Sequence, residues 1–162
     1  MTFNIVLVEP EIPQNTGNIV RTCAATGSIL HLVGPLGFSI DDRYLKRAGL
    51  DYWDEAKVKY YDNFEELKNK YSSGRFLYAT TKSPKSYSEV KYKEEDFIVF
   101  GKETKGLPEE LLKANMNSLL RIPMREKIRS LNLSNSVAVV LYEAYRQNDF
   151  QGLEDKSTWL TR

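Results

Sequence analysis

The chain of 162 residues is poor in the residues from which disulfides and metal sites are built. Cys23 is its one cysteine and His31 its one histidine. An intramolecular disulfide is therefore impossible, and one Cys with one His does not make a usual zinc site. We expect a cytoplasmic protein without a bound metal, because a chain without disulfides suits a reducing compartment. Both residues lie in apolar patterns, so we expect them to be packed in the interior.

Long apolar runs and an excess of one charge are also missing. No apolar run is long enough to span a bilayer, and the N-terminus lacks the basic region of a signal peptide, so we expect no membrane contact. The net charge is +1, so nucleic-acid binding would have to rely on local basic patches. Neither G-x-G-x-x-G nor G-x-x-x-x-G-K-[ST] occurs, which argues against a dinucleotide fold and a P-loop.

The remaining composition is that of a globular protein, with 41% hydrophobic and 28% charged residues. We expect one domain over residues 1–155 and a polar tail over 156–162. Strand-like and helix-like patterns alternate almost throughout, which predicts an α/β fold with a mainly parallel sheet flanked by helices. The expected strands are 5–8, 29–33, 58–61, 76–80, 97–100 and 119–122. The expected helices are 15–26, a short one from 41, 63–71, 109–114 and 137–147.

In parallel sheets, ligands bind beyond the carboxyl ends of the strands, and the first unusual loop follows Val8. Two prolines make residues 9–14 a stiff loop that should not be helical. The motif Asn15-x-Gly17-Asn18-x-x-Arg21 then opens a helix. Arg21, one turn into that helix, could reach back over its N-terminus and clamp a phosphate. A capped helix with a solvated arginine is the alternative.

A second unusual loop, residues 101–108, follows the apolar run that ends at Phe100. Its glycines would let a flat cofactor approach the backbone, whose polar groups can read an adenine edge. Glu103 could orient Arg21 or accept a hydrogen bond from the ligand. The alternative is a surface carboxylate beside Lys102 and Lys105.

The third stretch, residues 122–147, ends in a helix with an apolar face of Val137, Val140, Leu141 and Ala144. Its start should lie among four N-cap residue types, Asn132, Ser134, Asn135 and Ser136. A helix start exposes free N–H groups, which suit an anionic or carboxylate ligand. An over-capped helix without a ligand is the alternative.

In this order and spacing, the three loops resemble those of the SPOUT-class RNA methyltransferases, specifically the small tRNA wobble-ribose 2′-O-methyltransferases. The resemblance covers nearly the whole chain. Its motifs are residues 8–18 with Arg21, Arg47-Ala48-Gly49-Leu50-Asp51-Tyr52, residues 100–108, Ile122-Pro123-Met124 and residues 130–147.

This resemblance implies a trefoil knot formed by the C-terminal third and a homodimer in which both chains shape the active site. It implies S-adenosylmethionine as cofactor, bound bent within the knot, with S-adenosylhomocysteine as product. The residues it assigns to the cofactor are Ala79, Thr80, Gly101, Glu103, Gly106, Ile122, Ser130 and Leu131. The catalytic assignment falls on Arg21, supported by Asn15, Glu103, Ser130 and Asn132.

The implied substrate is the wobble nucleotide, a cytidine or modified uridine, in a tRNA anticodon stem-loop. RNA phosphates should be contacted by local basic groups, with Tyr142 as a further RNA or dimer contact. The basic candidates are Arg43, Lys46 and Arg47 on one helix face, and Arg121, Arg125, Lys127 and Arg129 beside the third stretch. Three alternatives stay open: an RNA-binding module of this fold without catalysis, methylation of another tRNA or rRNA position, and an unrelated nucleotide-binding α/β enzyme.

Overall fold

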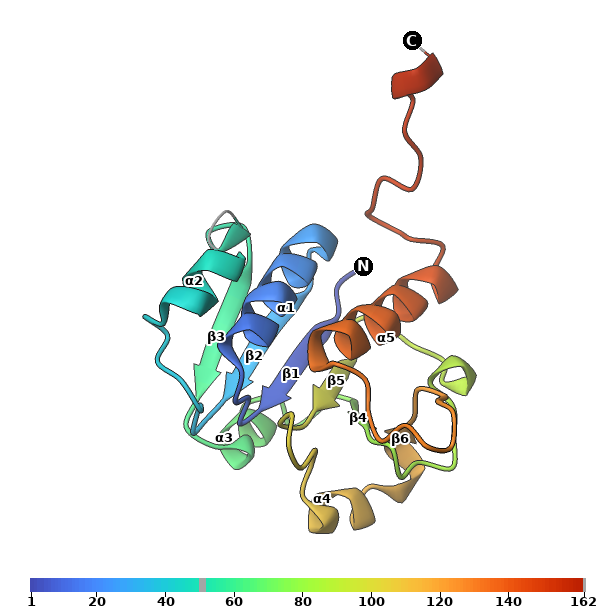
Figure 1. Cartoon of the computed structure of the whole chain (residues 1–162). Helices are drawn as coiled ribbons and strands as arrows, with labels where there is room; N and C mark the ends of the chain where they lie inside the picture. Colours follow the sequence, from blue (N-terminus) through green and yellow to red (C-terminus); the bar gives the residue numbers. More distant parts are fainter. Residues whose placement is uncertain (50–51, 162) are drawn as a thin grey trace.

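A computed structural model describes residues 1–49 and 52–161 of the chain. Of the motifs that carry the resemblance, Leu50 and Asp51 lie outside the described residues. The rest of the chain forms a sheet covered by helices on both faces (Figure 1).

Six strands form one sheet in the order β3-β2-β1-β5-β4-β6, and every pairing is parallel. The expected parallel α/β architecture is therefore confirmed. The strands are β1 Asn4–Val8, β2 Ile29–Val33, β3 Lys57–Tyr61, β4 Phe76–Ala79, β5 Phe97–Phe100 and β6 Leu119–Leu120. The central strands β1 and β5 are buried along their whole length, as their unbroken apolar runs require.

Helices cover both faces of this sheet. The helices α1 and α5 pack on one face over a core that includes Cys23, and α2 lies beside α1. On the other face, α3 and α4 bury Leu67 and Leu112 against the sheet. The α-helices are α1 Pro13–Thr26, α2 Arg43–Gly49, α3 Phe64–Lys70, α4 Glu109–Lys113 and α5 Leu133–Gln147. Short 3-10 turns are η2 Tyr87–Glu89, η3 Met116–Ser118 and η4 Trp159–Thr161. None of the described helices is long and apolar enough to cross a membrane.

The expected start of the first helix is wrong by two residues. The helix begins at Pro13 rather than at Asn15, with Ile12 at the N-cap. Proline suits the first helical turn because its missing N–H has no partner there in any case, and its fixed φ is already helical. The second proline of the loop therefore begins the helix instead of excluding it.

The expected last strand is too long by two residues. β6 ends at Leu120, and Arg121 forms a parallel bridge with Ser86 instead. The Arg121 N–H donates to the Lys85 carbonyl at 2.9 Å, and Tyr87 N–H donates to the Arg121 carbonyl at 2.7 Å. The chain that leaves the sheet here is thus held against the segment after β4.

The same segment after β4 is also held at the far end of α5. Tyr92 N–H donates to the Gln147 side chain at 3.1 Å, and the Asn148 amide donates to the Tyr92 carbonyl at 3.3 Å. Figure 1 shows the connection from β6 to α5 running beside this segment before the helix returns over the sheet. The C-terminal third therefore wraps around residues 81–92, the arrangement expected of a C-terminal knot.

Cys23 and His31 are packed in the interior, as expected. Both are fully buried. Burial raises the pKa of the Cys23 thiol to about 12. The His31 ring lies between Asn4 Oδ1 at 2.8 Å and the Tyr61 hydroxyl at 3.0 Å. Burial, helped by the charges of Lys59 and Lys70, lowers the pKa of His31 to about 3, so this ring is neutral.

Candidate functional site

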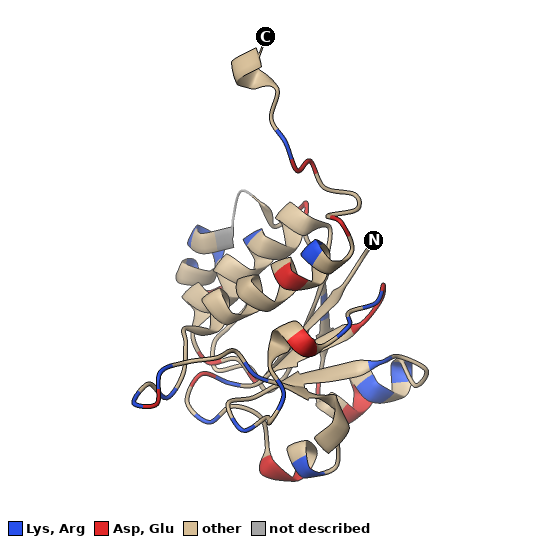
Figure 2. Cartoon of the chain, turned by 90° about the vertical axis from the view of Figure 1, so that its right-hand side faces the viewer, with Lys and Arg blue, Asp and Glu red and all other residues tan. Residues whose placement is uncertain are grey.

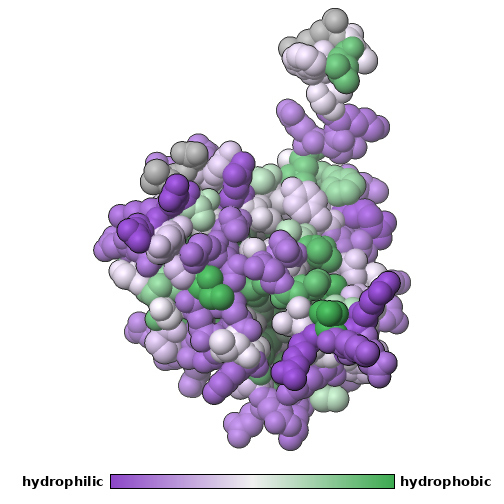
Figure 3. Space-filling model, in the orientation of Figure 1, coloured by the Kyte–Doolittle hydropathy of each residue, from purple (hydrophilic) through white to green (hydrophobic). Residues whose placement is uncertain are grey.

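A cavity of about 490 Å³ lies where the loops after β1, β4 and β5 meet the connection from β6 to α5. Figure 3 shows a hollow on this face, with apolar surface inside it and hydrophilic surface around it. The carboxyl ends of parallel strands thus converge on one site, as expected for such a sheet. Every residue that the resemblance assigns to the cofactor lies in the cavity wall: Ala79, Thr80, Gly101, Glu103, Gly106, Ile122, Ser130 and Leu131.

The predicted catalytic residues are only partly brought together. Asn15, Glu103 and Asn132 line the cavity, whereas Arg21 does not. Arg21 is exposed on α1, and its guanidinium lies 4.8 Å from the centre of the Tyr52 ring. Because α1 begins at Pro13, Arg21 stands about two turns into the helix rather than one. Its side chain therefore does not reach back over the helix start, and its catalytic role stays a prediction.

The loop after β5 is a tight turn closed on itself. Gly106 N–H donates to the Lys102 carbonyl at 2.9 Å, and Gly106 adopts a left-handed φ of +66°. A Cβ atom on Gly101 would overlap the backbone of Gly106 and Leu107. Only glycine fits at position 101, so the turn presents its backbone to the cavity.

Two carboxylates connect this turn to the loop after β1. Glu103 Oε2 accepts the N–H groups of Glu11 at 2.8 Å and Ile12 at 3.0 Å. In return, Glu11 Oε1 accepts the Thr104 N–H at 3.1 Å and its hydroxyl at 2.7 Å. These bonds from Thr104 hold the pKa of the Glu11 carboxyl below its usual value. The sequence-based assignment missed Glu11, because nothing local marks it as the partner of a residue 93 positions away.

Glu103 keeps one oxygen free of such bonds. Its Oε1 atom is buried and has no hydrogen-bond partner among the described residues. It also makes no ion pair with Arg21 within the described part of the chain. A buried acceptor without a partner is costly, so this atom can accept a hydrogen bond from a ligand in the cavity.

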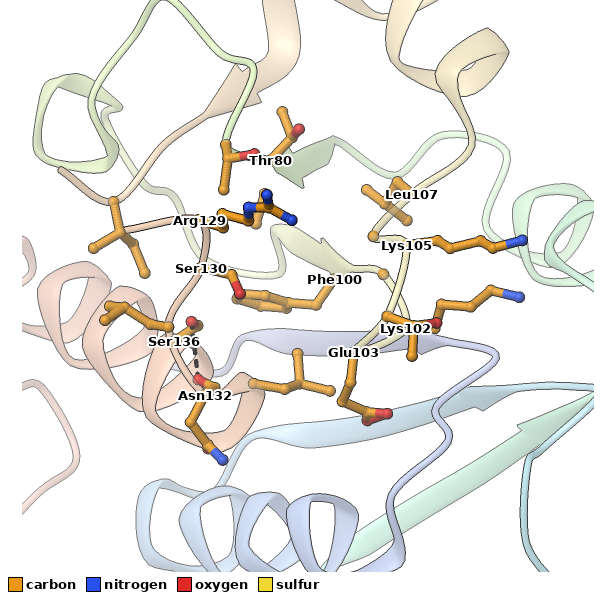
Figure 4. A pocket seen from close by; sticks show the side chains of 18 of the residues that line it. Thr80, Phe100, Lys102, Glu103, Lys105, Leu107, Arg129, Ser130, Asn132 and Ser136 are labelled. Atoms are coloured by element: carbon orange, nitrogen blue, oxygen red, sulfur yellow. Dashed lines mark hydrogen bonds between the residues drawn. The ribbon is translucent and has the colours of Figure 1, made fainter. Parts of the chain in front are cut away.

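The opposite wall of the cavity is the start of α5. Asn132 is its N-cap, as expected from the N-cap residue types there, and its Oδ1 accepts the Asn135 N–H at 3.2 Å. Its Nδ2 donates to Asn15 Oδ1 on α1 at 3.0 Å. In Figure 4, Asn132 and Ser136 stand on the wall facing the turn that carries Glu103. One side chain thus caps α5 and joins it to α1.

The predicted RNA-binding residues lie on separate elements of the structure. Arg43 and Arg47 are exposed on α2, and Lys46 there pairs with Asp41 at 3.5 Å. Tyr142 is exposed on α5. Figure 2 shows basic positions scattered over loops and helix ends, with acidic ones between them. Along the described ribbon on that side of the molecule, the basic positions are therefore spread over several elements.

Near the cavity, Arg125 and Arg129 lie in the connection to α5. Both are exposed, and the Arg129 side chain also points into the cavity (Figure 4). Lys102 and Lys105 point away from it. Lys82 also lines the cavity, in a polar segment that carried no recognisable motif.

Comparison with known proteins identifies the family. The model of the SpoU rRNA methylase family matches residues 2–142. The chain belongs to this family. Its α/β fold with a C-terminal trefoil knot is thereby confirmed, since the structural neighbours of this chain are knotted SpoU methyltransferases.

Individual relatives are similar over nearly the full chain. A Listeria innocua protein, named provisionally as a tRNA (cytidine(34)-2′-O)-methyltransferase, is 57% identical over 156 residues, which are 94% of this chain and 92% of the relative. A structure described under the 2-OH methylation of C/U34 on tRNA has a TM-score of 0.88 and 43% identity, covering 93% of this chain and 98% of its own. An AdoMet-bound rRNA methyltransferase from Sinorhizobium meliloti has a TM-score of 0.78 and 25% identity, covering 90% of this chain and 56% of its own.

Proposed function

We propose that this SpoU-family protein transfers a methyl group from S-adenosylmethionine to the ribose 2′-hydroxyl of the wobble nucleotide of tRNA. The nucleotide is a cytidine or a modified uridine in the anticodon loop, and S-adenosylhomocysteine is the second product. The observation that carries the proposal is one cavity walled by all three motif loops. Relatives named for methylation of cytidine 34, similar over almost the whole chain, support the substrate.

The residues of the cavity suit this cofactor. A volume of about 490 Å³ lies within the range of roughly 300–1,000 Å³ for small-molecule sites. Phe100, Leu107 and Ile122 offer apolar contact for a flat base, and the turn at Gly101 exposes backbone polar groups beside them. The unpartnered Glu103 Oε1 supplies an acceptor for a hydroxyl or ammonium donor. The bound cofactor supplies an electrophilic methyl group on a sulfonium.

For an in-line displacement, the protein must hold the acceptor hydroxyl in line and ease the loss of its proton. The bond between Asn15 and Asn132 fixes the two helix starts that flank the cavity. We assign to Arg21 the binding of a substrate phosphate and the polarisation of the 2′-hydroxyl. A guanidinium stays protonated and cannot act as the base, so the proton leaves to that phosphate or to water.

Arg21 lies outside the cavity wall of its own chain, so we propose that the active form is a homodimer in which both chains shape the site. Arg21→Lys tests the role of the planar guanidinium. We expect turnover to fall at least about tenfold while donor affinity is kept, since one positioned donor is commonly worth 10²–10³ in kcat. Near-full turnover of the lysine variant would show that the reaction does not need the planar guanidinium.

The decisive experiment uses labelled methyl donor with total tRNA, followed by mapping of the ribose-methylated nucleotide. Label at nucleotide 34 supports the proposal, and label at another nucleotide would show that the enzyme methylates a different position in RNA. Donor binding without methyl transfer would indicate an RNA-binding module of the same fold that lacks catalysis. Failure to bind the donor, with binding of another nucleotide, would indicate a different enzyme.

RNA binding should depend on scattered basic groups near the cavity and on α2. Arg125 and Arg129 are the candidates near the cavity, and Arg43, Lys46 and Arg47 those on α2. We expect tRNA affinity to fall steeply between about 50 and 200 mM salt, as phosphate contacts require. A flat salt response, measured by filter binding, would argue against these groups as phosphate contacts.

A further inference from the structure

We infer that Glu11 is a positioning residue, which together with Thr104 couples the loop that binds the methyl donor to the start of α1. This inference rests on the proposed function for its kinetic and donor-binding parts, whereas the exchange pattern of the protein without donor does not depend on it. It concerns a residue pair outside the motif positions assigned to catalysis or to the cofactor.

The contact is built from two reciprocal pairs of hydrogen bonds. Glu103 reaches from the loop after β5 to the backbone of Glu11 and Ile12, and Glu11 reaches back to the backbone and hydroxyl of Thr104. Neither loop can move without breaking bonds to a carboxylate, which are about twice as strong as those between neutral groups. We call this four-bond arrangement the carboxylate clamp.

The loop after β1 is held at its other points as well. Gly37 N–H donates to the Pro10 carbonyl at 2.9 Å, and a Cβ on Gly37 would lie 2.8 Å from the Glu11 Cα. Glu9 has a left-handed φ of +52°, and its carboxylate lies 3.7 Å from Lys102 Nζ. A non-glycine residue keeps such a conformation only when its surroundings impose it. Contacts with Gly37 and with Lys102 therefore hold this loop on two sides, and the clamp connects it to the loop that lines the cavity.

The clamp lies between two functional regions. On one side, the turn at 101–107 lines the donor cavity and is closed by its own Gly106–Lys102 bond, so it should keep its shape without Glu11. On the other side, α1 carries Asn15 and Arg21 and has no side-chain cap of its own. Removal of the Glu11–Thr104 half of the clamp, with Glu103 kept, should therefore leave donor binding intact and misplace the start of α1. Displacements of about 1 Å can cost 10²-fold in rate.

The kinetic test compares Glu11→Ala and Thr104→Val with their conservative partners, Glu11→Gln and Thr104→Ser. The conservative variants keep an acceptor or a hydroxyl at the same place. We expect kcat to fall about tenfold or more in the first pair, with donor Kd changed less than about threefold, and near-normal kcat in the second pair. The double variant Glu11→Ala/Thr104→Val should be no worse than Glu11→Ala alone, because Glu11→Ala already removes both bonds from Thr104, whereas Thr104→Val removes only the one from the hydroxyl. Glu109→Ala, which removes an exposed ion pair with Lys113, is the matched control.

Hydrogen exchange gives a measurement that does not need turnover. In the protein without donor, Glu11→Ala and Thr104→Val should speed exchange in residues 9–15 and 102–105, while Glu109→Ala should not. Adding S-adenosylmethionine should slow exchange in both segments of the natural protein, and only in 102–105 of the two variants.

The outcomes separate the two proposals. Unchanged exchange at 9–15 in both variants overturns the clamp whether or not the protein methylates tRNA. Normal kcat in both variants of an active enzyme overturns it too, as does an equal loss of kcat in the conservative variants. An inactive natural protein with the expected exchange pattern would instead count against the proposed reaction and leave the coupling supported.

Discussion

The two long helices that flank the cavity begin in different ways. At the start of α5, Asn132 caps its own helix by accepting the Asn135 N–H at 3.2 Å. At the start of α1, the N-cap is Ile12, which has no side-chain acceptor. The backbone N–H groups of Glu11 and Ile12 are instead satisfied by Glu103, 92 and 91 positions further along the chain.

This difference shows that one helix start is complete by itself and the other depends on a distant loop. A capped start needs only its own turn to be ordered. The N–H groups of the two residues before α1 are bonded only when the loop after β5 is in place, and that loop lines the cavity. Anything that orders or disturbs the cavity should therefore affect α1 more than α5.

The largest effect is expected from Gly101→Ala, which changes the loop on which α1 depends. Its Cβ would overlap the backbone of Gly106 and Leu107, so the turn must open. Overpacking of this kind costs about 1–3 kcal/mol, and more where backbone must move. We expect donor binding to be lost in calorimetry and exchange to rise at residues 9–15, with the 133–147 helix less affected. Gly152→Ala, outside the cavity wall, is the control for backbone strain alone, because its φ of +90° disfavours a side chain. Donor binding at normal affinity in the Gly101 variant would contradict the prediction.

A second, smaller effect should come from the start of α5. Asn132→Asp keeps the cap acceptor but loses the amide that donates to Asn15, whereas Asn132→Ala loses both. The alanine variant should lose about 1 kcal/mol of unfolding free energy as a lost cap. The aspartate variant should keep most of that stability and still turn over more slowly, because Asn15 is no longer tied to α5.

Denaturant unfolding and kcat, measured on both Asn132 variants, check this separation. Equal stability of the two variants would mean that the cap contributes nothing beyond the bond to Asn15.

Local patterns predict what depends on neighbours along the chain. The strand 97–100 and the strand 29–33 were predicted with the bounds that the structure has, because apolar runs, unbroken in the first and interrupted only by His31 in the second, suit strands buried on both faces. The cap of α5 followed from residue types with short polar side chains. The cavity residues followed from the family resemblance, since nothing in periodicity brings Ala79 beside Ser130.

The features that could not be predicted are long-range contacts. The Glu11–Thr104 contact joins residues 93 positions apart, and the end of β6 is set by the pairing of Arg121 with Ser86. The contact of the Arg21 guanidinium with the Tyr52 ring, at 4.8 Å from the ring centre, is likewise a contact between distant parts of the chain. Each depends on how distant loops meet after folding, which residue spacing does not encode.

Acid should loosen the contact before α1 more than the start of α5, because that contact is made by the Glu11 carboxylate and the cap of α5 is a neutral amide. The pKa of Glu11 is lowered from 4.5 by its bonds from Thr104. Its contribution is therefore present above about pH 4.5 and is lost as the pH falls through the lower, folded pKa. We expect the amide NMR signal of Thr104, whose N–H donates to Glu11, to move in that window, while the Asn135 signal stays.

Glu11→Gln is the control for this titration, because its side chain does not ionise. His31 also lowers stability in acid, since its pKa of about 3 in the fold lies below its usual 6.5. That loss begins near pH 6.5, as the unfolded state takes up a proton. It is shared by the Gln variant, so the difference between the two proteins reports Glu11. Identical titration curves for the natural protein and Glu11→Gln would show that Glu11 does not cause the change in the amide signal.

The smallest effect is expected when α1 is given a cap of its own. Ile12 has extended backbone angles, φ −107° and ψ 110°, that suit an N-cap residue, and the residue is 41% exposed. Ile12→Thr keeps the β-branch and adds an acceptor for the first turn, worth about 0.5–1 kcal/mol before the loss of apolar contact. We expect a rise of about 1–3 °C in Tm. In this background Glu11→Ala should speed exchange at residues 9–15 less than it does alone, because α1 would no longer depend on the distant loop. An equal response in both backgrounds would show that a local cap cannot replace the long-range one.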